Sequence, residues 1–182
     1  MKHDCIYSWL CSRLHYHVVA NIRGLTMPDP RLVECNAEGI ALIKEFEGLR
    51  LEAYRCPAMK WTIGYGHTGS NIKEGSTITE TIANRLLRSD IDNIHIKLKS
   101  MIKTPLNENQ WSAIVCLVFN VGIYAFQKSR LLKCINANQP NCVREEWIAW
   151  CHYKEFWSGK MIESDGLKRR RKAEYELFIK EC

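Results

Sequence analysis

Three side chains with catalytic chemistry lie close together in this sequence. Cys56 follows Glu47 by nine residues, and Thr62 follows Cys56 by six. A carboxylic acid can protonate a leaving group, and a hydroxyl can both donate to and accept from a water molecule. This spacing predicts a site that protonates an oxygen atom and orients a water for attack.

Glu47 is expected at the C-terminal end of a helix. Asn36 is a suitable N-cap, and an apolar stripe that includes Ile40 and Ile43 stops at Gly48. The negative end of a helix dipole favours a protonated carboxyl group and raises its pKa, which suits an acid that works near neutral pH. Alone, a glutamate here would be an ordinary surface residue; the residues downstream favour the catalytic role.

Short alternating segments over residues 51–55 and 61–65 predict a small antiparallel sheet. Pro57 separates them, and three glycines follow the second segment: Gly64, Gly66 and Gly69. Thr62 falls on the second strand, where its hydroxyl could hold a water opposite the acid. Threonine is also simply a good strand residue, so this position gains its meaning from Glu47.

Beyond residue 79 the pattern is helical. One apolar face runs along a long helix that ends before Pro105: Ile82, Leu86, Leu87, Ile91, Ile94, Leu98 and Ile102. Asn107 can cap the next helix, which is apolar nearly all round over residues 111–121 and is expected at the centre of the larger lobe. Three more helices are expected: 126–135, 143–153 and 166–179. The sum is an α+β fold with a small antiparallel β lobe, a larger helical lobe and a cleft between them.

The bulk composition limits the class of protein. The chain has 182 residues, a formal net charge of +6 and no apolar run near the roughly 20 residues that a membrane span needs. One domain without a stable membrane anchor is therefore expected. The modest positive charge suits an anionic polymer such as cell wall or nucleic acid through steering, or solubility alone. The basic run over residues 168–172 could be a nucleic-acid patch by charge, but by position it opens the last helix, and no nucleic-acid partner is expected.

The nine cysteines do not form a recognisable framework. Their number is odd, and no two have the spacing of a zinc knuckle or redox motif. We expect mostly reduced thiols, several of them core fillers, of which Cys116 in an apolar run is the clearest. The histidine spacing likewise predicts no metal site, and the expected chemistry needs no cofactor.

Residues 1–34 are expected to be an N-terminal extension, and 35–182 the catalytic domain. Charged residues and histidines interrupt every apolar run of the extension, so no export signal is convincing. The extension is interpreted as a poorly ordered arm, or as absent from the mature protein if translation starts at Met27.

The segment from Glu47 to Thr68 resembles the active-site stretch of the phage-type lysozymes, the muramidases of glycoside hydrolase family 24. Their pattern is Glu, eight residues, Asp or Cys, five residues and Thr, and it continues as Thr-Ile-Gly-Tyr-Gly-His-Thr, which is found here at 62–68. Two weaker blocks agree. Residues 106–122 resemble the family's Leu-x-x-x-Gln and Phe-Asn-x-Gly pieces, and residues 166–174 its Gly-Leu-x-Arg-Arg-Arg-x-Ala-Glu.

The resemblance implies roles for several residues. Glu47 is the acid, Thr62 fixes the water, and Cys56 takes a second catalytic position that is Asp in many relatives. A thiol is largely neutral at pH 7, so Cys56 puts the family's two-carboxylate mechanism in doubt for this chain. The thiol also permits inactivation by disulfide formation and recovery by thiol exchange.

Three further residues are expected to support the site or bind substrate. His67 ends the hairpin and is expected to be structural rather than a proton shuttle. Asn120 is either a ligand for the sugar or a plain helix-end amide. Arg170 is the arginine expected against the acid, where it would oppose the dipole effect on the pKa; its basic neighbours are expected to be solvated.

The resemblance implies a lysozyme, an endolysin that hydrolyses the β-1,4 bond between N-acetylmuramic acid and N-acetylglucosamine in peptidoglycan. The expected partner is the glycan strand. A monomer that collects in the host cytoplasm and needs a holin to reach the wall is expected. Two alternatives remain open: a lytic transglycosylase that cuts the same bond without water, and a non-catalytic peptidoglycan-binding descendant of the fold.

Overall fold

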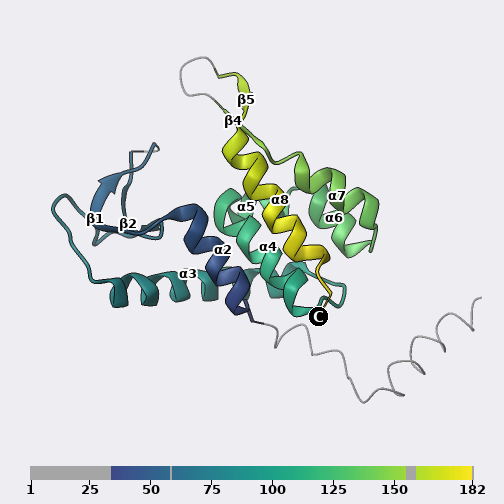
Figure 1. Cartoon of the computed structure of the whole chain (residues 1–182), viewed down its shortest axis with the longest axis horizontal. Helices are drawn as coiled ribbons and strands as arrows, with labels where there is room; N and C mark the ends of the chain where they lie inside the picture. Colours follow the sequence, from purple (N-terminus) through teal and green to yellow (C-terminus); the bar gives the residue numbers. More distant parts are fainter. Residues whose placement is uncertain (1–33, 58, 155–158, 182) are drawn as a thin grey trace, which may run out of the picture.

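The computed structural model describes residues 34–57, 59–154 and 159–181 (Figure 1). The expected N-terminal extension, except its last residue, lies outside them. Figure 1 shows a small sheet at one end of the long helix α3 and a group of helices beside the other end, so the expected α+β architecture of two unequal lobes is confirmed.

The first helix leads directly into the small sheet. Helix α2 (Ala37–Glu47) begins after Asn36, whose side chain accepts from the Gly39 N–H, and ends at Gly48 with a φ of 68°. The sheet follows in the order β1 (Arg50–Arg55), β2 (Trp61–Gly64) and β3 (His67–Thr68), and all its pairs are antiparallel. The two expected strands are thus confirmed, and a short third one completes the hairpin.

Helix α3 (Glu80–Met101) connects the two lobes. Thr79 caps it, a role that the sequence analysis did not assign, and the predicted apolar face is confirmed in part: Leu87, Ile91, Leu98 and Ile102 are buried. Ile82 is exposed, and the buried stripe is Ala83, Leu87, Ile91, His95 and Leu98. A Cβ at Gly64 would lie 3.5 Å from that of Ala83, within van der Waals contact, so β2 packs closely against α3 here.

Helix α4 (Glu108–Val121) is the buried centre of the larger lobe, as predicted. Asn107 and Gln110 form a capping box at its start, and Gly122 ends it. The single helix expected over 126–135 is wrong: the chain forms α5 (Ile123–Gln127) and α6 (Arg130–Asn136). The break lies at Ser129, whose hydroxyl accepts from the Leu132 N–H and starts a new helix.

The next helix also differs from the prediction over 143–153. Helix α7 (Pro140–Ile148) starts earlier, because proline is well accommodated in a first turn, and it ends before Tyr153. Tyr153 belongs to a hairpin that the sequence did not predict, formed by β4 (His152–Lys154) and β5 (Met161–Glu163). Helix α8 (Asp165–Ile179) follows, close to the predicted bounds.

Packing of α4 against α8 and α2 forms the main core, with Trp111 and Trp147 fully buried. Cys116 is buried as expected. Cys134 and Cys142 form a disulfide that joins α6 to α7, a pair that the sequence did not single out. Within the described residues, no helix combines the length and apolar character that a membrane crossing requires.

Candidate active site

Glu47 is the last residue of α2, and its carboxylate is held from the side of α8. Arg170 Nη1 donates to Glu47 Oε1 over 2.7 Å, and the glutamate side chain is 21% exposed. Placement at the helix end and contact with Arg170 are both as the sequence predicted. The carboxylate is therefore fixed through one oxygen while part of it stays open to solvent.

Arg170 is itself held by three further contacts. Its Nε donates to Glu174 Oε1 over 3.0 Å, its Nη2 lies 3.4 Å from the carbonyl oxygen of Cys116, and its guanidinium lies over the ring of Phe46 at 5.5 Å. The side chain is 5% exposed. Such a pre-organised guanidinium fixes the orientation of the carboxylate that it contacts.

A second arginine extends this buried network. Arg171 was expected to be solvated, but it is fully buried, and its Nη2 donates to Glu174 Oε1 over 3.1 Å and to Asn120 Oδ1 over 2.9 Å. A buried carboxylate between two cationic residues explains the difference, because one guanidinium alone would leave Glu174 poorly compensated. Burial raises the pKa of Glu174, against the opposing effect of Arg171 and then Arg170. Arg169 is exposed, as predicted.

Gly66 brings the hairpin up to the acid, a role that the sequence analysis did not assign. Its φ is 92°, and a Cβ built on it would lie 3.6 Å from Glu47 Oε2. This oxygen is the one that Arg170 does not hold. A side chain at residue 66 would therefore contact Oε2, and the left-handed backbone permits only glycine there without strain.

Cys56 and Thr62 are linked through one main-chain atom. The Cys56 N–H donates to the Lys60 carbonyl oxygen over 3.0 Å, and the Thr62 hydroxyl donates to the same oxygen over 3.1 Å. Thr62 is buried on β2 opposite Tyr54 and Thr68, while Cys56 is partly exposed just after β1. Because the hydroxyl hydrogen of Thr62 is engaged, its oxygen is left to accept a hydrogen bond.

His67 and the cleft complete the region. His67 Nδ1 lies 2.9 Å from Asp90 Oδ2 on α3, which holds the ring at the junction of hairpin and helix. A cavity of about 240 Å³ lies next to Asp90, between the hairpin and the helices; none of the predicted site residues lines it, although their neighbours Gly66 and Thr68 do. The hairpin, α3 and α4 all contribute to its lining: Gly66, Thr68, Asp90, Ile94, Phe119 and Gly122.

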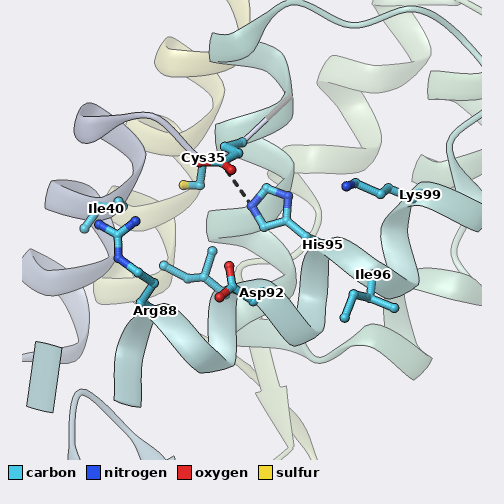
Figure 2. A pocket seen from close by; sticks show the side chains of 9 residues that line it. Cys35, Ile40, Arg88, Asp92, His95, Ile96 and Lys99 are labelled. Atoms are coloured by element: carbon cyan, nitrogen blue, oxygen red, sulfur yellow. Dashed lines mark hydrogen bonds between the residues drawn. The ribbon is translucent and has the colours of Figure 1, made fainter. Parts of the chain in front are cut away.

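Another cavity, of about 150 Å³, lies on the other side of α3 and contains none of the predicted site residues (Figure 2). Its wall includes Cys35, Arg88 and His95. The Cys35 N–H faces His95 Nε2 at 3.2 Å (Figure 2). On the other side of the ring, the Trp111 indole N–H faces His95 Nδ1 at 2.9 Å. Burial lowers the pKa of His95, and Lys99 lowers it further.

Comparison with known proteins agrees with this geometry. The phage lysozyme family model matches residues 44–174. The endolysin of Acyrthosiphon pisum secondary endosymbiont phage 1 is 45% identical over 141 residues, which are 78% of this chain and 94% of the relative.

Solved structures show the same fold. The muramidase domain of SpmX from Asticaccaulis excentricus has 37% identity and a TM-score of 0.76, and the match covers 81% of this chain and 99% of that one. The endolysin from Escherichia coli O157:H7 phage FAHEc1 has 33% identity and a TM-score of 0.74, covering 81% and 94%.

Proposed function

Because this chain belongs to the phage lysozyme family, we propose that it is an endolysin that hydrolyses the β-1,4 bond between N-acetylmuramic acid and N-acetylglucosamine. The observation that carries the proposal is the carboxylate of Glu47, held through Oε1 by Arg170, partly exposed, and adjacent to Gly66, which lines the cavity between the hairpin and the helices. A carboxyl group placed in this way can act on a polymer that lies along the cleft.

Glu47 acts as the general acid, and its two oxygens have different tasks. Oε1 accepts from Arg170, so Oε2 carries the proton and donates it to the glycosidic oxygen. As the leaving sugar departs, positive charge develops on the other sugar ring. The fixed Oε1 keeps Oε2 in position for this transfer.

Thr62 and Cys56 serve the attacking water. The Thr62 oxygen accepts one hydrogen of the water, whose lone pair then points at the sugar carbon. Cys56 stands where a carboxylate would serve as base or stabilise the cationic sugar. The water oxygen bonds to the anomeric carbon from the face opposite Glu47 as the bond to the leaving oxygen breaks, and the surplus proton of the water passes to solvent. This gives inversion, as in inverting hydrolases.

His67 and Asn120 support the site. The Asp90 contact fixes the ring of His67 below the hairpin turn, and Arg171 fixes the amide oxygen of Asn120. With that oxygen engaged, the amide N–H₂ of Asn120 is the part that can donate to a sugar hydroxyl or N-acetyl group.

The test is turbidity clearing of purified peptidoglycan by the wild type, Glu47→Gln and Cys56→Ser under reducing conditions. The wild type clears, Glu47→Gln does not, and Cys56→Ser is slowed. If the wild type does not clear peptidoglycan, the proposed enzymatic activity is refuted and the non-catalytic, wall-binding alternative is favoured.

The products decide between the hydrolase and the transglycosylase alternative. Mass spectrometry should show reducing N-acetylmuramic acid ends, whereas 1,6-anhydro ends would mean that no water takes part. Proton NMR of the first products gives the anomer and so tests inversion.

Delivery to the substrate completes the proposal. The protein acts as a monomer, collects in the host cytoplasm and reaches the wall or periplasm through a holin. Co-expression with and without a holin should separate the cases: lysis only with the holin supports the route, and lysis by the enzyme alone contradicts it. Light scattering of the purified chain gives the oligomeric state.

A further inference from the structure

The unexpected hairpin after α7 brings together three metal-ligating side chains. Register pairs His152 on β4 with Glu163 on β5, and Cys151 directly precedes β4. One donor atom from each lies within 4.8 Å of the other two. In Figure 1 this hairpin stands at the start of α8, apart from the β1–β2 sheet.

The separations fit a tetrahedral metal. Cys151 Sγ lies 3.4 Å from His152 Nδ1 and 3.7 Å from Glu163 Oε1. A zinc ion with ordinary bonds to sulfur, nitrogen and oxygen would place such ligands about 3.6 Å apart at tetrahedral angles. The third separation, between His152 and Glu163, is at most 4.8 Å, so their side chains need only close on the ion.

The surroundings suit a site of this kind. Lys168 Nζ donates to Glu163 Oε2 over 2.6 Å, which leaves Oε1 directed at the thiol. Cys151 is buried, whereas His152 and Glu163 are exposed, so an ion can enter. Cys151 and Glu163 also line a cavity of about 630 Å³, which leaves room for water in a fourth position.

We propose that Cys151, His152 and Glu163 form a zinc-binding site that ties the β4–β5 hairpin together. Thiolate and imidazole ligands select zinc over calcium or magnesium. On binding, the Cys151 thiol releases its proton to solvent, and the thiolate, the imidazole Nδ1 and one carboxylate oxygen bind the ion. Lys168 orients the carboxylate from outside the site.

Cobalt(II) titration of the reduced full-length protein tests the proposal. Cobalt replaces zinc and gives a thiolate charge-transfer band when a cysteine binds it. The wild type should show a band that saturates at one equivalent more than Cys151→Ser does, and zinc should abolish it. His152→Ala and Glu163→Gln, both at exposed positions, should weaken binding at least tenfold while remaining folded.

The control is Cys35→Ser, which removes a thiol elsewhere and should keep the band. Comparison of variants is essential because the chain has other cysteines and histidines. Equal cobalt binding by the wild type, Cys151→Ser and Glu163→Gln would overturn the proposal, as would a wild-type protein that binds no cobalt. Zinc should also raise the melting temperature of the wild type more than that of His152→Ala.

Discussion

Arg170 contacts Glu47 from the far end of the chain: 123 residues separate them in sequence, and 2.7 Å separates Arg170 Nη1 from Glu47 Oε1. The same guanidinium donates to Glu174, so one side chain contacts both a buried carboxylate of α8 and the partly exposed carboxylate of the candidate active site. Stability and activity are therefore expected to depend together on this arginine.

Arg170→Gln should lower both the stability of the fold and the lytic activity. Removal of one partner from a buried ion pair costs about 3 kcal/mol or more in the free energy of unfolding. Arg170→Lys should regain part of that stability but little of the turnover number, because one ammonium cannot match the forked contacts of a guanidinium. Urea denaturation and the rate of peptidoglycan clearing measure the two effects. Arg169→Gln, at an exposed position, is the control, and equal losses there would contradict this explanation.

Gly66→Ala should reduce activity more than its cost in stability explains. A left-handed alanine costs about 1–2 kcal/mol, and the added methyl group would cover Oε2 of Glu47. Gly75→Ala is a matched control, because Gly75 has a φ of 76° and no atom lies within 4 Å of the position that a Cβ would take there. Both variants should lose similar stability, and only Gly66→Ala should clear peptidoglycan at least tenfold more slowly. Equal clearing rates would show that Gly66 has only a backbone role.

Because Cys56 is a thiol, we expect the lytic rate to depend on its oxidation state. Treatment with oxidised glutathione should lower the lytic rate, since the thiolate attacks the disulfide, forms a mixed disulfide and releases glutathione. Reductant should restore the rate. Cys56→Asp carries the carboxylate of many relatives and should stay active under both conditions. Equal wild-type rates with and without reductant would count against the idea.

His95 should make the fold less stable in acid. A neutral imidazole can accept from one of its two N–H neighbours and an imidazolium from neither, and burial already lowers the pKa of His95 from 6.5. Its stabilising effect is complete above pH 6.5 and declines as the pH falls toward the lowered folded-state pKa, because the unfolded chain takes up the proton first.

The loss can reach about 1.4 kcal/mol per pH unit within that window. Urea denaturation between pH 7.5 and 5 should therefore show a steeper fall for the wild type than for His95→Gln. Parallel curves would exclude His95 as the cause.

Local signals explain what the sequence could predict. Capping residues such as Asn36 and Asn107 determine helix starts through contacts with their own first turn, so those boundaries were predicted well. Glu47 and Arg170 were placed together because each belongs to a block that resembles the family. The Gly66 contact depends on how the hairpin packs, and the sequence offered only a glycine after the second strand as a hint of it.

The errors have a common physical cause in tertiary packing. Arg171 looked like part of a solvated basic run, yet the buried Glu174 compensates its charge. Ser129 split an expected helix because its side chain competes for backbone N–H groups. The β4–β5 hairpin lacks strong alternation, and without it the neighbourhood of His152 and Glu163 could not be predicted, since the pair meets only across strands.

The shared acceptor at Lys60 has a consequence for how this site can evolve. A main-chain carbonyl joins Cys56 to Thr62, so no exchange of the Lys60 side chain deletes the link. The side chain at residue 60 can therefore change in charge and size without loss of this contact, because the main-chain oxygen sets the spacing between Cys56 and Thr62. An insertion or deletion between Cys56 and Lys60 would displace the shared carbonyl and break the link between Cys56 and Thr62.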